Sequence, residues 1–214
     1  MIVSRVMTKN PVYIDPGSSV SEARDLMDKE KIRYLPVLDK NNTLVGIVTK
    51  EDLVKAGPSP ATTLDMYEIS YLLSKLKVSE AMVKKVITVD EDEVIEEAAR
   101  IMADRGISCL PVMKGSLLVG IITDMDLFRL FLDIFGSRHK GVRLVIYTAD
   151  KIGQLAIITK AIAEKGGNIV SFISSEGDDI AHRRDTLKVS GIPKDELELI
   201  VKKIPEVVLE DIRG

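Results

Sequence analysis

The 214-residue chain has one cysteine, two histidines and no tryptophan, and only 4% of its residues are aromatic. Because Cys109 is the single thiol, an intrachain disulfide framework is excluded and a reducing compartment is favoured. The shortage of aromatic rings leaves few platforms for base stacking, and the formal net charge of −3 gives no attraction to nucleic acid or to an anionic membrane. We therefore expect no nucleic-acid partner and no membrane partner.

Long hydrophobic runs are also missing. The most apolar run, residues 117–122, is too short to cross a bilayer. The first residues, MIVSRVMTKNP, lack the apolar stretch of a signal peptide. With 45% apolar and 29% charged residues, the composition is ordinary for a folded protein, and a cytoplasmic location is expected.

No group of residues in the sequence has the spacing of an active site. His139 lies in a basic linker and His182 lies beside RRD, and neither has the spacing to Cys109 that a zinc site requires. GKS phosphate loops and GxGxxG fingerprints are absent. Cys109 lies within an apolar strand, which favours a small core residue over a reactive thiol. We expect no catalytic residues, no metal ligands and no catalytic cofactor, so the protein is predicted not to be an enzyme.

The sequence does contain an internal repeat. The stretch GIVTKEDL at 46–53 returns as GIITDMDL at 120–127, and upstream residues recur 75 positions apart, as Val3 and Val78 do. In each copy an extended segment precedes an amphipathic helix, two β-branched runs then form a hairpin, and a second helix follows the threonine. Each copy is thus a β-α-β-β-α unit too small to cover both faces of its sheet. The two copies should therefore pack together as one pseudo-symmetric body.

Together with the two copies, the remaining segments predict the α+β fold class. Between the copies, KAGPSPATT is predicted to be a loop and LDMYEISYLLSKL a helix with an apolar stripe. After about residue 140 the pattern becomes β-α-β-β-α-β, the ferredoxin-like order. The predicted domains are repeats at 1–57 and 78–136, a linker helix at 58–77 and a third domain at 141–214.

In each copy the motif Gly-x-x-Thr-x-x-Asp falls where a strand ends and a helix begins. An ionised carboxylate only accepts hydrogen bonds and so suits two vicinal ribose hydroxyls, while amides at the helix start would attract a phosphate. Thr49 and Asp52, with Thr123 and Asp126 in the second copy, therefore predict a ribose-phosphate site that is present twice. Helix capping alone explains the same residues. Both interpretations stay open, because duplication copies caps as well as sites.

The repeated motifs resemble a tandem pair of cystathionine-β-synthase-type (CBS) domains, a Bateman module, over roughly residues 1–135. The resemblance rests on VMTKNPVYI, IRYLPVLD and LVGIVTKEDL and on their counterparts AMVKKVITV, ISCLPVMK and LVGIITDMDL. It implies that an adenosine-containing ligand (AMP, ADP, ATP or S-adenosylmethionine) binds in clefts between the repeats. Asp52 and Asp126 would then hold the ribose, and Thr49 and Thr123 the ribose or the α-phosphate. Residues at the start of each repeat would wall the adenine: Thr8, Val12, Tyr13, Val83, Ile87 and Thr88.

In several members of this family a basic residue two positions before the hydrophobic-Pro step reaches phosphate. Arg33 occupies this position in the first repeat, whereas the second repeat has Ser108. The two clefts are therefore expected to be unequal, with a phosphorylated ligand in the cleft that Arg33 reaches. A solvated surface charge is the alternative for Arg33.

The C-terminal segment resembles an ACT domain, a small regulatory fold often found binding amino acids. The match rests on TADKIGQLAIITKAIAEKGGNIVSF, in which Asp150, Gly153 and Leu155 supply the family's Asp-x-x-Gly-x-Leu and Asn168 also fits. Ile152 replaces the usual proline. ACT domains generally bind effectors at side-by-side interfaces, and the order CBS–CBS–ACT resembles the bacterial acetoin-utilisation regulatory proteins.

Two functions of different class follow from these resemblances. The first is a regulatory sensor with an adenosine-type ligand between the CBS repeats and an amino-acid-type effector at the ACT interface, coupled allosterically. The second is a ligand-free scaffold that dimerises and docks onto a metabolic enzyme or transporter, which the apolar LFRLFLDIF at 127–135 favours. Both predict a homodimer, and the first adds small-molecule effectors and a regulated enzyme as partners.

Overall fold

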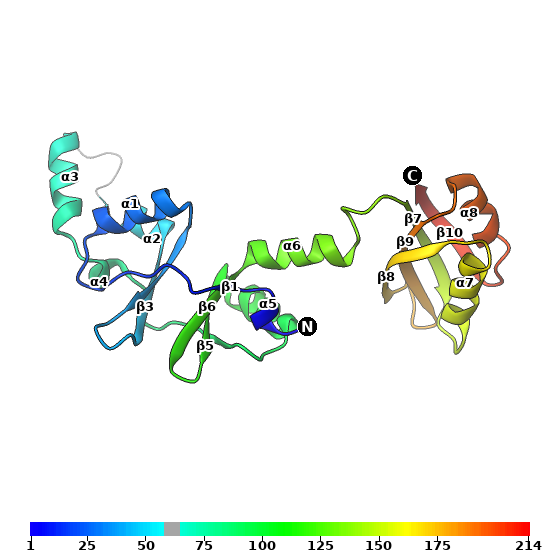
Figure 1. The fold of residues 1–214 in the computed structure, drawn as a ribbon, viewed down its shortest axis with the longest axis horizontal. Coiled ribbons are helices and arrows are strands. Elements are labelled where there is room, and N and C mark those ends of the chain that lie inside the picture. Colours follow the sequence, from blue (N-terminus) through cyan, green and yellow to red (C-terminus); the bar gives the residue numbers. More distant parts are fainter. Residues whose placement is uncertain (58–64) are drawn as a thin grey trace. The chain divides into compact units, whose positions relative to one another are not determined.

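A computed structural model describes residues 1–57 and 65–214, which form two compact units, Met1–Leu127 and Phe128–Gly214 (Figure 1). The division between the units falls within helix α6, Asp124–Ile134. Residues 58–64 of the predicted KAGPSPATT loop lie outside the described residues.

The first unit contains the two predicted copies. The extended segment of the first copy is reduced to a single bridge between Ile14 and Val37, whereas the second copy has a short strand at the same place. The elements of the first copy are η1 (Val3–Arg5), β1 (Thr8–Lys9), α1 (Val20–Glu30), β2 (Tyr34–Leu38), β3 (Leu44–Thr49) and α2 (Lys50–Lys55). After α3 (Met66–Lys75), those of the second are α4 (Val78–Ala81), β4 (Val89–Asp90), α5 (Ile95–Arg105), β5 (Cys109–Lys114), β6 (Leu117–Thr123) and α6.

The segments that lead into each copy exchange partners. Strand β1 pairs with β6 of the second copy, with Thr8 opposite Ile121. In the same way Val83, which leads into the second copy, bridges to Ile47 in β3 of the first. Val78 belongs to the hydrophobic core of the first copy, so the exchange includes packing as well as backbone pairing. The two copies are consequently interlocked.

The repeated glycines explain how the exchanged segments fit. A methyl group at Gly46 would lie 2.9 Å from Cγ of Met82 and closer still to its Sδ. A methyl group at Gly120 would likewise lie 3.0 Å from Cγ of Met7. Each glycine thus leaves room for a methionine of the other copy. The space left by each glycine is therefore filled by a side chain of the chain itself.

Helix packing in the first unit follows the predicted periodicity. Val20, Ala23 and Met27 of α1 are buried, and the helix begins with a capping box formed by Ser19 and Glu22. Leu73 of α3 is buried in the same core. A smaller cluster of Ile47, Cys109 and Ile121 joins the two hairpins, as expected for copies that pack sheet against sheet.

The second unit has the predicted order β-α-β-β-α-β, and its strands form one antiparallel sheet in the order β10-β7-β9-β8. Ile158 and Ile162 of the first helix and Leu197 and Val201 of the second pack on one core with residues of β7 and β9. No helix in the described ranges is long and apolar enough to cross a membrane. The elements are β7 (Val142–Ala149), α7 (Gln154–Ala163), β8 (Asn168–Glu176), β9 (His182–Ser190), α8 (Lys194–Val201) and β10 (Val207–Arg213).

Candidate functional site

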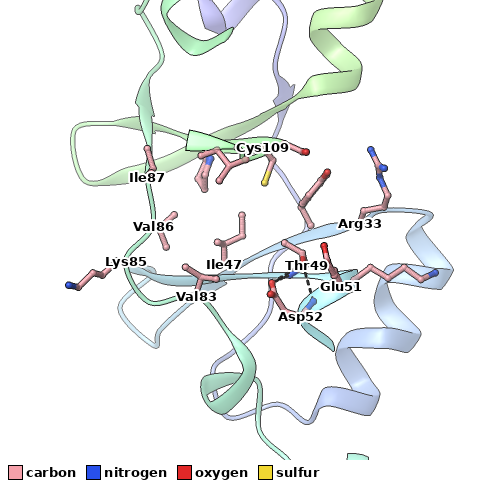
Figure 2. A pocket seen from close by; sticks show the side chains of 16 residues that line it. Arg33, Ile47, Thr49, Glu51, Asp52, Val83, Lys85, Val86, Ile87 and Cys109 are labelled. Atoms are coloured by element: carbon pink, nitrogen blue, oxygen red, sulfur yellow. Dashed lines mark hydrogen bonds between the residues drawn. The ribbon is translucent and has the colours of Figure 1, made fainter. Parts of the chain in front are cut away.

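A cavity of about 660 Å³ opens within the first unit, between the two copies (Figure 2). Its volume lies within the range typical of small-molecule sites. The first copy supplies part of the lining from the start of β2, from β3 and from the start of α2, and the second copy supplies the segment before β4 and the start of β5. The lining residues are Arg33, Tyr34, Ile47, Thr49, Lys50, Glu51, Asp52, Val83, Lys85, Val86, Ile87, Gly106, Ile107, Ser108, Cys109 and Pro111.

Five residues predicted from the sequence meet at this cavity: Arg33, Thr49, Asp52, Val83 and Ile87. Figure 2 shows Val83 and Ile87 on one side, Arg33 on the opposite side, and Thr49 with Asp52 between them. The apolar wall and the polar pair come from different copies, because Val83 reaches β3 through the exchange of leading segments.

The other predicted residues do not line this cavity: Thr8, Val12, Tyr13, Thr88, Thr123 and Asp126. Thr123 and Asp126 are the repeat counterparts of Thr49 and Asp52, and the Thr8–Ile121 pair mirrors the bridge between Val83 and Ile47. Thr8, Val12, Tyr13, Thr123 and Asp126 thus belong to the pseudo-symmetric position of the first unit, where a second ligand stays a prediction. Thr88 instead follows Ile87 in the segment that walls the first cavity, without lining it.

Thr49 and Asp52 form a complete capping box at the start of α2. The Thr49 hydroxyl donates to Oδ2 of Asp52 at 2.7 Å, the Thr49 amide donates to the same oxygen at 2.9 Å, and the Asp52 amide donates to the hydroxyl at 3.1 Å. The capping interpretation is therefore confirmed, and the hydroxyl proton is used in a hydrogen bond within the box. Because the box uses Oδ2 only, Oδ1 of the half-buried Asp52 lies outside it.

The second copy repeats this box with a different exposure. Thr123 donates to Oδ2 of Asp126 from its hydroxyl at 2.7 Å and from its amide at 3.0 Å. Asp126 is only 6% exposed, whereas Asp52 is half-buried and lines the cavity. The two sites therefore differ in solvent access as well as in the Arg33 position.

Charges of both signs surround the cavity. The guanidinium of Arg33 lies 3.5 Å from the carboxylate of Asp124, at the first position of α6. Lys50 forms an ion pair with Asp28 at 2.7 Å. Arg33 also lies 5.4 Å from the centroid of the Tyr34 ring. Arg33 is therefore a partly exposed surface charge, which is the alternative interpretation of this residue. It also lines the cavity and forms an ion pair with a residue of the second copy.

Cys109 and Tyr34 form part of the cavity wall. Cys109 is 8% exposed, and burial raises the pKa of its thiol to about 12. Burial also raises the pKa of Tyr34, against the lowering effect of a side-chain hydrogen bond with Ser108. Both groups are therefore neutral at physiological pH, and the expectation that Cys109 is a packed core residue is confirmed.

In the second unit three of the four residues predicted from the ACT resemblance lie together, and Asn168 lies apart from them. Asp150 and Gly153 lie in the turn from β7 into α7, where Gly153 has a φ of +89°, and Leu155 follows in the first turn of α7. Asn168 begins β8 and lies opposite Ser190, while the far end of β8 lies toward the β7–α7 turn. Asn168 is therefore at the opposite end of the sheet from Asp150.

Sequence reasoning missed several lining residues, and one was detectable. Lys50 and Asp124 hold the same position in the two copies, directly after the repeated threonine, so self-alignment reveals a charge reversal there. Lys85 and Val86 gave no comparable signal, because their place depends on how the segment before β4 crosses the first hairpin. Among the described residues, no group of three or more His, Cys, Asp and Glu side chains is arranged to hold a metal ion.

Two interlocked β-α-β-β-α copies with a cavity between them define a tandem-repeat protein with a small-molecule cleft. A family model agrees with this class: the CBS domain matches residues 3–59 and 78–133, more than half of the chain. The chain therefore belongs to the CBS domain family. The tandem CBS pair inferred from the motifs is confirmed.

Solved structures of CBS proteins resemble the first part of the chain. A Vibrio cholerae protein named for acetoin utilization (AcuB) is 30% identical with a TM-score of 0.53, and the match covers 65% of this chain and 98% of that one. The CBS pair of protein MJ0100, solved with 5′-methylthioadenosine and S-adenosylmethionine, is 31% identical with a TM-score of 0.52 over the same shares. CBSX2, solved with AMP, is 32% identical with a TM-score of 0.51, covering 62% of this chain and 97% of that one.

The first curated relatives are longer proteins. The L-aspartate semialdehyde sulfurtransferase of Methanocaldococcus jannaschii is 32% identical over 131 residues, which are 61% of this chain but 23% of that protein. The chain spans about a quarter of the length of the first such relatives that it matches. The activity in that name belongs to the longer protein.

Proposed function

We propose that the CBS pair binds an adenosine-containing ligand in the cavity and that the protein is a regulatory sensor rather than an enzyme. The observation that carries this proposal is the order of chemistry across the cavity. Val83 and Ile87 offer an apolar surface for a base, Asp52 offers a carboxylate for ribose hydroxyls, and Arg33 lies beyond them (Figure 2). The apolar surface, the carboxylate and the cation thus lie in the same order as the base, the ribose and the 5′ substituent of a nucleoside.

The ligands of related CBS pairs support the same class of molecule. The pair of MJ0100 was solved with 5′-methylthioadenosine and S-adenosylmethionine, and CBSX2 with AMP. All three ligands contain adenosine. We infer that adenosine is the recognised part and that the 5′ substituent distinguishes the ligands.

For the second unit we propose an ACT domain with a ferredoxin-like fold. Its β-α-β-β-α-β order and its antiparallel sheet support this assignment. An amino-acid-type effector would require two copies of the chain, because Asp150 and Asn168 lie at opposite ends of one sheet. We accordingly propose a cytoplasmic homodimer of the acetoin-utilisation regulatory type, to which the 30% identity with the Vibrio cholerae protein adds support over the CBS pair.

Isothermal titration calorimetry of the whole chain tests both sites. AMP, ATP, S-adenosylmethionine and 5′-methylthioadenosine are titrated first, and a panel of amino acids second. We expect at least one adenosine compound to bind with one dominant site per chain, because Asp126 is far less accessible than Asp52. Absence of heat from every adenosine compound at millimolar concentration, with a folded protein shown by circular dichroism, would contradict nucleotide sensing. Absence of heat from every amino acid would contradict the ACT effector alone.

The ligand-free scaffold is the second candidate function. The observation that favours it is the number of exposed apolar side chains on α6, including Phe128 at 61%, Phe131 at 53% and Ile134 at 50%. Such a face suits a protein partner. Thermal shift separates the two functions, because a ligand that binds only the folded state must raise the unfolding midpoint, whereas a pure scaffold shows no shift with any adenosine compound.

A further inference from the structure

We propose that Asp124 sets the charge preference of the cavity, so that it favours an adenosine compound with an uncharged or singly charged 5′ substituent over a di- or triphosphate. This inference rests on the proposed adenosine site and names the ligand class that the site selects. Its basis is an ion pair across the two copies at the Arg33 end of the cavity, where the carboxylate of Asp124 lies 3.5 Å from the guanidinium.

The backbone fixes both partners of this ion pair. The amide of Asp124 donates to the carbonyl of Ser108 at 3.0 Å, and the amide of Lys50 donates to the carbonyl of Arg33 at 2.9 Å. These two bonds are repeat counterparts, so equivalent hairpin ends of the two copies present Arg33 and Asp124. The carboxylate also accepts from the amide of Met125 at 2.7 Å, which further orients it.

The repeat has diverged at both of these positions. The first copy carries the cations Arg33 and Lys50, whereas the second copy carries Ser108 and Asp124 in their places. Lys50 is paired with Asp28 at 2.7 Å. Each cation at this end of the cavity thus has a carboxylate partner, which is the reverse of what a site for a highly charged polyphosphate would need.

The direction of the ligand brings its 5′ substituent to this ion pair. With the base against Val83 and Ile87 and the ribose at Asp52, the substituent extends toward Arg33 (Figure 2). A phosphate there must compete with Asp124 for the guanidinium and bear the repulsion of the remaining carboxylate. A thioether does neither, and a cationic sulfonium is attracted by the carboxylate but repelled by the guanidinium, so the two effects on it oppose each other. Both side chains are partly exposed, at 55% and 36%, so solvent screening keeps the effect moderate.

The test compares 5′-methylthioadenosine, AMP and ATP binding to the wild-type chain and to Asp124→Asn by calorimetry at low salt. We expect the affinity of methylthioadenosine to stay within about twofold, the affinity of AMP to rise roughly two- to fivefold, and that of ATP to rise more. Asp104→Asn is the matched control, since it removes an Asp–Arg pair of the same unit, with Arg100, outside the cavity. Each of the three ligands should bind this variant and the wild type with the same affinity.

Thermal unfolding accompanies each titration, because Asp124 also lies at a helix start where a negative charge is favourable. Asp124→Ser, which retains a good helix-start residue, is the second variant if Asp124→Asn is poorly folded. If methylthioadenosine binds the wild type but the AMP-to-methylthioadenosine affinity ratio is the same in the variants, the proposed role of Asp124 is wrong. That result would leave the proposed function intact. Failure of the wild type to bind any of the three compounds would instead overturn the proposed function, and this inference with it.

Discussion

At Asp52, capping and ligand recognition would draw on different atoms of the same carboxylate. Oδ2 accepts the hydroxyl and the amide of Thr49, and both bonds stabilise the start of α2. Oδ1 lies outside this box, in a side chain that lines the cavity. The capping bonds also fix the carboxylate in one orientation, so a ribose would meet an acceptor that is already positioned. Capping and binding are therefore compatible at this residue.

Replacing Asp52 by Ala should weaken adenosine binding by roughly ten- to a hundredfold, because a charged acceptor of the ribose hydroxyls is lost. The same change removes a helix cap and should lower the free energy of unfolding by about 0.5–2 kcal/mol. Calorimetry and chemical denaturation measure the two effects separately.

Glu22→Ala is the matched control for the Asp52 variant. Glu22 occupies the same third position of the Ser19 capping box on α1, outside the cavity. Its loss should cost a similar amount of stability and leave ligand affinity unchanged. An equal loss of affinity in both variants would mean that Asp52 acts only through the stability of the fold.

How far the sequence predicts this site depends on the residue. Thr49 and Asp52 could be predicted because their motif is written twice, and Arg33 because it follows a family pattern. The contact between Arg33 and Asp124 could not, since the two residues are 91 positions apart and meet only when the hairpin ends of both copies face each other. Long-range partners of this kind leave no periodic signal in a single sequence.

At the scale of elements, the exchange of leading segments is what builds the cavity. The helices and hairpins were predictable because apolar residues recur with period 3.6 or 2. The partner of each leading segment was not, because both copies offer nearly the same strand edge, in LVGIVT and LVGIIT. The choice is made by tertiary packing, in which Met82 lies over Gly46 and Met7 lies over Gly120.

Gly46→Ala should destabilise the first unit by about 1–3 kcal/mol, because a methyl group there overlaps the side chain of Met82. Denaturant unfolding of the variant measures the loss. Gly120→Ala should behave alike, because Met7 takes the same position against it.

The double variant Gly46→Ala with Met82→Ala is the control for this clash. A shortened side chain at position 82 removes the overlap. The double variant should therefore lose less stability than the sum of the losses measured for the two single variants. Strict additivity would show that the overlap with Met82 is not the cause of the loss.

At the scale of the whole molecule, α3 and α6 each carry several exposed apolar side chains. Tyr67 and Tyr71 of α3 are 87% and 63% exposed, and Phe128 and Phe131 of α6 are 61% and 53% exposed. Clusters of this kind on soluble proteins usually mark contact surfaces. A second copy of the chain is the occupant that the proposed function requires, because Asp150 and Asn168, which the ACT resemblance predicts as effector-binding, lie at opposite ends of one sheet.

The chain should therefore be a dimer in solution, with twice the 23.6 kDa of one copy by multi-angle light scattering. An unpaired charge buried in an apolar contact strongly weakens association. Tyr71→Asp or Phe128→Asp should therefore shift the measured mass toward that of the monomer. Leu117→Asp is the control, since Leu117 is similarly exposed at 55% but lies on neither helix. A wild-type monomer at every concentration up to about 100 μM would exclude the dimer, because a complex of even micromolar affinity is largely assembled there.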